Sequence, residues 1–160
     1  MSDQVKFQVI SDSVLGEELQ EEESKVFSEI LGVRKLTTDE ILINEGEPET
    51  TLFLLADGKL AVTTQVDGKE ISMYTMKKGE CAGTRSFIDA TKRKATLRAL
   101  EDCTVYTLEP NAFEALLEKH PRVVFKVMRA LFRVTHHNLT RMNMESQEMS
   151  NYISKSGGRY

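Results

Sequence analysis

The spacing of apolar residues along the chain predicts an opening helix followed by a series of strands. Over residues 16–31 apolar side chains recur every three or four positions and acidic side chains fill the opposite face, as in an amphipathic helix. After Gly32 the pattern changes to short apolar runs separated by glycine- and aspartate-marked turns. These runs predict strands at residues 33–36, 41–43, 52–55, 60–65, 71–76, 95–99 and 104–108. Many short strands at regular spacing indicate a sandwich, a jelly roll or a barrel.

Helical periodicity returns in the last third of the chain. One apolar face predicts a helix at residues 110–119, and the pair His120-Pro121 ends it because proline favours the first position of a new helix. Residues 123–153 contain neither glycine nor proline. We therefore expect a second, long helix over residues 121–149.

The long helix carries an apolar stripe that needs a partner surface. Its proposed anchors, Val124, Met128, Leu131 and Met142, follow an approximate three-to-four-residue spacing. Polar residues interrupt the stripe. The sequence therefore leaves two alternatives, a homodimer through this helix or a helix that packs on its own domain. The interrupting residues are Thr135, Asn138 and Glu145.

Length and composition favour one globular domain in the cytoplasm. The 160 residues are enough for a single core, predicted as an N-terminal segment (1–15), a domain (16–150) and a flexible tail (151–160). The longest apolar runs, such as residues 52–56, are far shorter than the roughly 20 residues of a membrane helix. The first residues lack a secretory pattern. The short apolar runs therefore predict no membrane association. Cys81 and Cys103 have no CxxC or histidine spacing, so we expect them to be free thiols.

The sequence offers little support for an enzyme. His120, His136 and His137 lack the spacing of a metal site, and no nucleophile has a matching base. Neither a P-loop nor a dinucleotide fingerprint is present. We therefore expect no catalytic residue, no metal and no cofactor. A net charge of −4 also argues against a nucleic-acid partner, although basic residues gather between residues 77 and 98.

Two segments of the sequence resemble conserved motifs of a known protein family. Residues 42–48, followed by residues 52–58 and 60–62, resemble the opening signature of cyclic-nucleotide-binding domains, the modules of catabolite activators and protein kinase A regulatory subunits. Gly83 is followed ten positions later by Arg93, which opens a stretch similar to the phosphate-binding cassette of that family. The resemblance implies a mainly β fold, an antiparallel β-roll of the jelly-roll type with an N-terminal helix and a long C-terminal helix.

The resemblance also implies a ligand site. In the family, amides at the start of a short helix and one arginine hold the cyclic phosphate, and a glutamate accepts the ribose hydroxyl. Thr84 stands in place of that glutamate, and Glu80 fits the spacing poorly because the stretch to Arg93 would be four residues longer. The sequence therefore predicts weak binding. The ligand-binding positions that the resemblance implies are Gly83, Thr84, Arg85, Ser86, Arg93, Lys94, Ala95 and Thr96.

Two functions follow from these observations. The first is a stand-alone regulatory module that senses cAMP or cGMP and signals through its C-terminal helices to an effector protein. The alternative is a ligand-free domain that acts as a protein–protein interaction module. Direct DNA binding is not expected, because only a short tail follows the long helix. For Arg93, the alternative to a phosphate contact is a surface ion pair with Asp89, Glu101 or Asp102.

Overall fold

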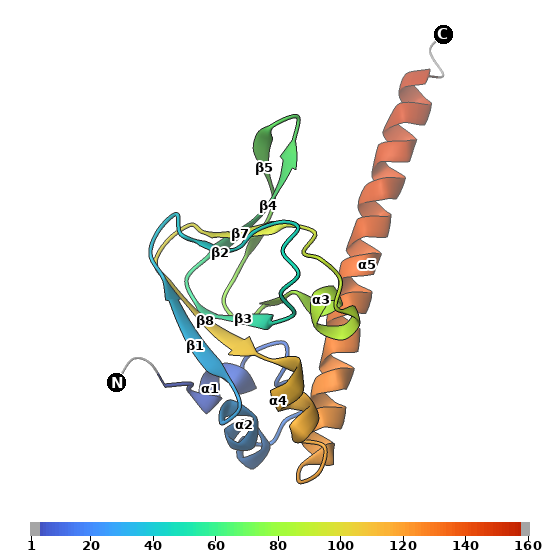
Figure 1. Ribbon diagram of the computed structural model, residues 1–160. Coiled ribbons are helices and arrows are strands. Elements are labelled where there is room, and N and C mark those ends of the chain that lie inside the picture. The colour runs from blue at the N-terminus through green and yellow to red at the C-terminus, as the bar shows by residue number, and fades with distance from the viewer. Residues whose placement is uncertain (1–3, 158–160) are drawn as a thin grey trace.

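A computed structural model describes the backbone of residues 4–157; the side chains of residues 142, 143, 145, 146, 149 and 152–157 lie outside the description. Helices and strands follow one another as in Figure 1. The helices are α1 (Phe7–Ser11), α2 (Glu21–Ser28), α3 (Thr84–Asp89), α4 (Pro110–Ala115) and α5 (Pro121–Gly157). The strands are β1 (Gly32–Leu36), β2 (Ile41–Ile43), β3 (Leu52–Asp57), β4 (Leu60–Val66), β5 (Lys69–Met76), β6 (Cys81–Ala82), β7 (Thr96–Ala99) and β8 (Cys103–Leu108).

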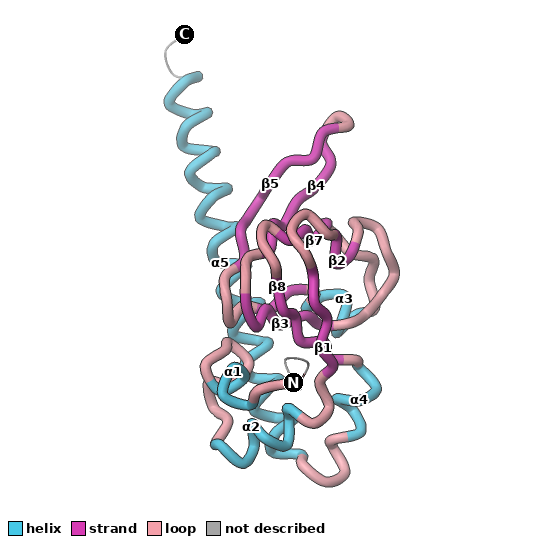
Figure 2. The backbone as a smooth tube through the Cα atoms, turned by 90° about the vertical axis from the view of Figure 1, so that its left-hand side faces the viewer, coloured by secondary structure: helices cyan, strands magenta, loops and turns pink. Residues whose placement is uncertain are grey.

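Two antiparallel sheets form the body of the molecule. Their strand orders are β1-β8-β3-β6 and β2-β7-β4-β5. The helices α1, α2 and α4 lie at one end of the sheets, and α5 runs along their side (Figures 1 and 2). The β4–β5 hairpin projects from the opposite end. The expected antiparallel β-roll with flanking helices and a long C-terminal helix is therefore confirmed.

Several element boundaries differ from those that the sequence predicts. The helix predicted over residues 16–31 is shorter, because a capping box between Gln20 and Glu23 starts α2 at Glu21. Gly16 instead lies in a turn against α1, where an added Cβ would be 2.0 Å from the main-chain oxygen of Ile10. Helix α1 and the two-residue strand β6 were not predicted. In the other direction, α5 continues to Gly157, while residues 158–160 of the predicted tail lie outside the described residues.

Two apolar clusters make up the core. One fills the inside of the roll around Phe53, Leu55 and Val105. The other lies between the sheet and the helices. Ile10 belongs to this second cluster and is completely buried, so the segment before residue 16 contributes to the core of the domain. Phe27 of α2 meets Phe113 of α4 edge to face, with ring centroids 6.3 Å apart.

The first half of α5 completes the second cluster. Val124 and Leu131 are only 7% and 2% exposed and pack in the core of their own chain. The prediction that these two residues anchor a second copy is therefore wrong, because their helix face already covers the sheet and the helices beneath it. Met128 is exposed, and the side chain of Met142 lies outside the described residues. None of the helices over the described residues is both long and apolar enough to cross a membrane.

The burial of Ile10 predicts that the N-terminal segment stabilises the whole domain. Replacing Ile10 with alanine removes a fully buried side chain, and we expect the free energy of unfolding to fall by about 2–5 kcal/mol. Ile71 is 45% exposed on β5, and the matched change Ile71→Ala should stay within about 0.5 kcal/mol. Urea unfolding measures both values. Equal stabilities of the two variants would contradict the assignment of Ile10 to the core.

Candidate functional site

The turn into α3 is built around a glycine. Gly83 follows β6 with φ 92° and caps the N-terminus of α3. An added Cβ would lie 2.2 Å from Nη1 of Arg93 and 3.1 Å from the main-chain oxygen of Thr51. Only glycine therefore allows the arginine to approach so closely. The main-chain amides of residues 84–86 lie in the first turn, where a helix has no acceptors of its own for N–H groups and favours an anion.

The main chain of Arg93 joins the two segments that carry the family resemblance. Its amide donates to the oxygen of Glu47 at 2.9 Å, and its oxygen accepts from the amide of Gly46 at 2.8 Å. Nearby, the Thr96 hydroxyl accepts a hydrogen bond of 2.9 Å from the amide of Glu45. The turn between β2 and β3 is thereby fixed against the chain that enters β7. Thr96 thus has a structural role in this turn.

The side chain of Arg93 points into the protein. It is only 5% exposed, and Nη2 donates to the main-chain oxygen of Thr51 at 2.6 Å. The guanidinium lies over the ring of Phe53, 5.0 Å from its centroid. Nε and Nη1 have no hydrogen-bond partner within the described part of the chain. The alternative of a surface ion pair with Asp89, Glu101 or Asp102 therefore does not describe this arginine.

The charge of Arg93 is only partly compensated by its surroundings. Burial lowers the pKa of its guanidinium, while the carboxylates of Glu49, Glu47 and Glu109 act in the opposite direction. The Thr51 hydroxyl oxygen lies 2.8 Å from Oε1 of Glu49 and 2.9 Å from Oε1 of Glu109, so the two carboxylates near the site share its single proton donor. An anion beside Nε and Nη1 would supply the hydrogen bonds that the protein leaves unmade.

The other predicted site residues have different surroundings. Arg85 and Lys94 are exposed, Ser86 is buried in α3, and Ala95 is half-buried before β7. The Thr84 side chain lies beside the Cys81 thiol, whose pKa burial raises to about 12. The structure therefore brings Arg93 against Gly83 but leaves Arg85 and Lys94 at the surface.

A cleft of about 940 Å³ lies beside this turn, between the roll and α5. Neither Gly83 nor Arg93 lines it, although Ala82, the residue before Gly83, does. Sequence reasoning missed the cleft because its two walls are far apart in the chain. Asn138, one of the polar residues that interrupt the stripe of α5, lines the cleft and was the available signal. Its polar lining includes Tyr74 and Glu80 of the roll and Arg133, His137, Asn138 and Arg141 of α5.

Contacts across the cleft connect the roll to α5. The guanidinium of Arg141 lies over the ring of Tyr74, 4.5 Å from its centroid. The Tyr74 hydroxyl in turn donates to Oε2 of Glu80 at 2.5 Å. Glu80 also accepts a hydrogen bond of 2.9 Å from the amide of Lys77, in the turn before β6. The side chains of Glu80, Tyr74 and Arg141 therefore form a continuous series of contacts from the roll to α5.

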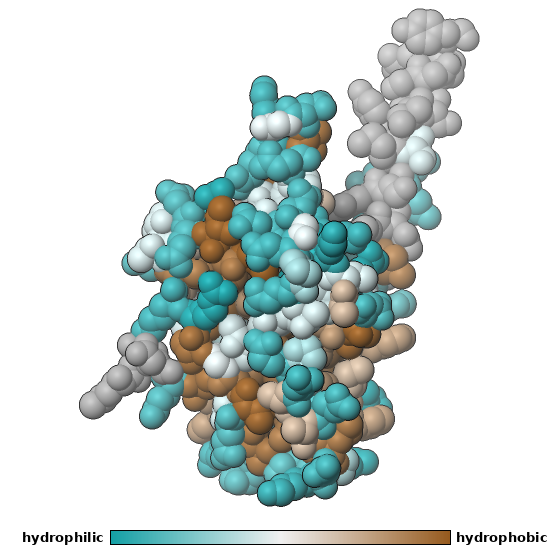
Figure 3. Space-filling view, viewed as in Figure 1, coloured by the Kyte–Doolittle hydropathy of each residue, from teal (hydrophilic) through white to brown (hydrophobic). Residues whose placement is uncertain are grey.

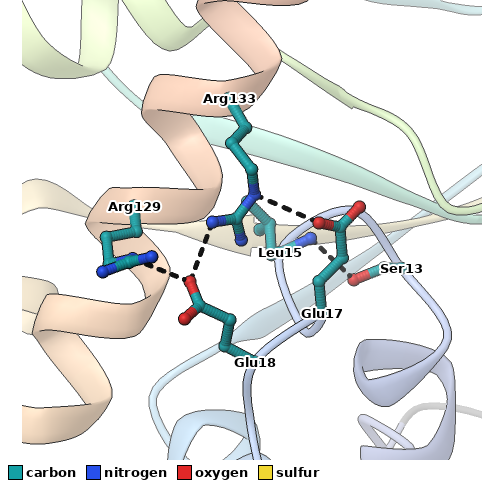
Figure 4. A network of polar contacts seen from close by, with 6 residues as sticks. All are labelled: Ser13, Leu15, Glu17, Glu18, Arg129 and Arg133. Atoms are coloured by element: carbon teal, nitrogen blue, oxygen red, sulfur yellow. Dashed lines mark hydrogen bonds and ion pairs between the residues drawn. The ribbon is translucent and has the colours of Figure 1, made fainter.

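Ion pairs connect the first half of α5 to the segment between α1 and α2 (Figure 4). Arg133 donates to Glu18 at 2.8 Å and to Glu17 at 3.1 Å, and Arg129 donates to Glu18 at 3.1 Å. The hydrogen bond from Arg133 is the main reason that the pKa of Glu18 lies below its usual range. Lys126 adds a further ion pair nearer the start of α5, with Glu23 of α2 at 2.7 Å.

Comparison with known proteins identifies the fold and the family. The family model described as the cyclic nucleotide-binding domain matches residues 33–120, more than half of the chain. The chain belongs to this family. A crystal structure of a cyclic nucleotide-binding domain from Methylobacillus flagellatus has the same fold, with a TM-score of 0.79 at 20% identity, over 84% of this chain and 79% of that one.

Two relatives are much longer proteins. The cAMP-dependent protein kinase regulatory subunit of Hypocrea atroviridis is 33% identical over 96 residues, which cover 60% of this chain and 20% of that protein. Lysophospholipase NTE1 of Mycosarcoma maydis is 23% identical over 113 residues, which cover 70% of this chain and 6% of that protein. The chain therefore spans a fifth or less of the length of these relatives.

The contact between Tyr74 and Glu80 predicts an unusual tyrosine titration. The hydrogen bond to Glu80 is the main reason that the pKa of Tyr74 lies above its ordinary 10.0, and partial burial adds to it. In the variant Glu80→Gln the pKa of Tyr74 should fall, because the carboxylate that holds the phenol proton is gone. Tyrosinate absorbance measures the titration, with Tyr74→Phe assigning the signal. The same curve in wild type and Glu80→Gln would show that the contact is absent in solution.

Proposed function

We propose that this chain is a regulatory module that binds a cyclic nucleotide, cAMP or cGMP, and signals through α5 to a partner protein. The module is proposed to be non-enzymatic, to need no cofactor and to act in the cytoplasm on a protein rather than on DNA or a membrane. Membership of the cyclic nucleotide-binding domain family supports the ligand class. The relative from Hypocrea atroviridis is named as cAMP-dependent, which favours cAMP as the first ligand to test.

The buried guanidinium of Arg93 carries this proposal. A buried charged group without its hydrogen bonds is costly, and two N–H donors of Arg93 are left without partners beside Gly83. The cyclic phosphate of a nucleotide has the charge and the oxygen acceptors that these donors lack. The amides of residues 84–86 add further donors on the same turn. The site is therefore suited to one phosphate-sized anion.

The cleft supports a link between the ligand and α5. A nucleotide whose phosphate lies at Gly83 extends naturally past Ala82, which lines the cleft. Its nucleoside would then lie between the roll and α5. Because α5 forms one wall, a bound ligand would have different contacts in different positions of the helix, and this difference is the requirement for signalling.

One observation favours the alternative, a ligand-free domain that serves as a protein–protein interaction module. Thr84 occupies the position where the family has a glutamate, and its side chain lies beside the Cys81 thiol. Without a carboxylate at that position, the ribose would lose its charge-assisted hydrogen bond, which is roughly twice as strong as a neutral one. A measurement of nucleotide binding separates the two functions.

Arg93→Lys tests the phosphate contact. Lysine keeps the positive charge but removes the forked donors, so the affinity for cAMP should fall roughly tenfold to a hundredfold, as expected for about 1.5–3 kcal/mol of a charged hydrogen bond. Arg122→Lys makes the same change at an exposed position of α5 and should bind like the wild type. Calorimetry at millimolar nucleotide gives the affinities, and circular dichroism verifies folding. If the wild type gives no heat with cAMP or cGMP, the interaction module is the better description.

We also propose that α5 pairs with a second copy of the chain, through an exposed face that shares only Met128 with the anchors first predicted. Phe125, Met128, Phe132 and Leu139 are exposed and separated by three, four and seven residues. This spacing is that of a heptad seam, which requires another helix as its partner, and a second copy supplies an identical one. In Figure 3 hydrophobic residues reach the surface around α4 and the first half of α5, whereas the projecting hairpin is mainly hydrophilic.

Phe132→Asp tests the dimer. Phe132 is 74% exposed, so the change should leave the fold intact while a charge in the seam separates the two copies. Light scattering should then give half the mass of the wild type. Leu117→Asp, at an exposed apolar position outside α5, is the matched control and should keep the mass of the wild type. A wild type that is monomeric at every concentration would contradict the proposal.

A further inference from the structure

Two carboxylates line the cleft, and their partners differ. Glu17 accepts from Nε of Arg133 at 3.1 Å, so its charge is paired with a cation. Glu80 accepts from the Tyr74 hydroxyl and from the Lys77 amide, which are neutral donors. None of the ion pairs described among the side chains placed by the structure includes Glu80. Glu80 therefore presents a carboxylate without a described direct ion pair at the wall of the cleft, with Arg141 nearby over the ring of Tyr74.

The carboxylate of Glu80 is held in place and has free acceptor sites. Tyr74 reaches it from β5, and the Lys77 amide reaches it from the turn that precedes β6. That turn is closed by a hydrogen bond of 3.1 Å from the Glu80 amide to the Lys77 oxygen, and Gly79 adopts φ 93° within it. An ionised carboxylate offers about four acceptor sites, and the two protein donors leave about two of them open. A hydrogen-bond donor in the cleft could therefore use Glu80 without displacing Tyr74.

Thr84 does not offer a hydrogen-bond acceptor in the cleft as Glu80 does. Its side chain lies beside the Cys81 thiol, and Thr84 is not among the residues that line the cleft. The position that replaces the family glutamate therefore does not face the cleft beside α5. Glu80 lies four residues earlier in the sequence but does face it. Sequence spacing argued against Glu80, because spacing along the chain does not show which side chains point into a cavity.

The path of β6 connects Glu80 to the proposed phosphate site. Cys81 and Ala82 form this strand and pair with Leu54 and Phe53 of β3. A strand advances about 3.3 Å per residue, so the backbone of Glu80 lies roughly 10 Å from that of Gly83. The residues between them, Cys81 and Ala82, also line the cleft. A nucleotide anchored by its phosphate at Gly83 has a comparable length and can extend along β6 as far as Glu80.

We propose that Glu80 recognises the nucleoside part of the ligand by accepting a hydrogen bond from a ribose hydroxyl or from an amino group of the base. This proposal rests on the proposed cyclic-nucleotide-binding function and adds a residue to it. Tyr74 is a positioning residue, because its hydroxyl and that of the ligand would share the same carboxylate. Through the contact of Tyr74 with Arg141, recognition at Glu80 would also be connected to α5.

Calorimetric titration with cAMP and two analogues tests the proposal on the full chain. Wild type, Glu80→Gln and Thr84→Val are compared, with Glu118→Gln as the same chemical change at an exposed position of the chain outside the cleft. One analogue, 2′-deoxy-cAMP, lacks the ribose hydroxyl, and cyclic inosine monophosphate lacks the amino group of the base. We expect Glu80→Gln to weaken cAMP binding roughly tenfold to a hundredfold, whereas Glu118→Gln should leave it unchanged.

The analogues identify the donor and do not depend on the folding of any variant. The analogue that lacks the donor should bind the wild type more weakly by a similar factor, and Glu80→Gln should no longer distinguish it from cAMP. The proposal is overturned if Glu80→Gln binds cAMP like the wild type, or if Thr84→Val alone carries the loss. Wild-type binding that depends on Arg93 would then leave the proposed function standing. If the wild type binds no cyclic nucleotide at all, both the proposed function and the role of Glu80 are overturned.

Discussion

The burial of one guanidinium organises the candidate site. Arg93 connects the turn after β2 through its main chain, the start of β3 through Thr51, and the turn before α3 through its approach to Gly83. Removing a charged group from water is costly unless hydrogen bonds replace those to water. One hydrogen bond and the face of Phe53 recover only part of that cost. The incomplete compensation is the observation that supports the proposed ligand site, because most buried donors in proteins have hydrogen-bond partners.

Three faces of the long helix contact the core, line the cleft and remain exposed, and the geometry of a helix makes this possible. Residues three, four and seven apart share a face, so one helix can present separate stripes to separate partners. Val124 and Leu131 belong to the stripe that enters the core. Arg133 and Arg141 belong to the stripe that lines the cleft, and Phe132 lies on the stripe that remains exposed. A change at the cleft therefore acts on the same rigid element that carries the exposed apolar stripe.

The sequence predicts those features that depend on local pattern. The longer strands and helices follow from residues close together in the chain, whereas the placement of Gly83 and Arg93 in one site came from the resemblance to the family. Helix α1 and strand β6 were missed because each is too short to show a period, and β6 exists only through its pairing with β3. The anchors of the long helix were misassigned for a related reason. Apolar spacing defines a helix face, but it does not say whether the core or a second copy covers that face.

The contacts that α5 makes with the rest of the domain limit which part of the helix can respond to a ligand. A ligand shifts an equilibrium only by its difference in affinity for the two states. Moving the first half of α5 would expose Val127 and Leu131, which are fully buried, at a cost of several kcal/mol. Surface ion pairs such as Arg129 with Glu18 contribute much less. Beyond Val134, the described ring contact to the roll is that of Arg141 with Tyr74. A response of α5 therefore costs least free energy in this later part, where His137, Asn138 and Arg141 line the cleft.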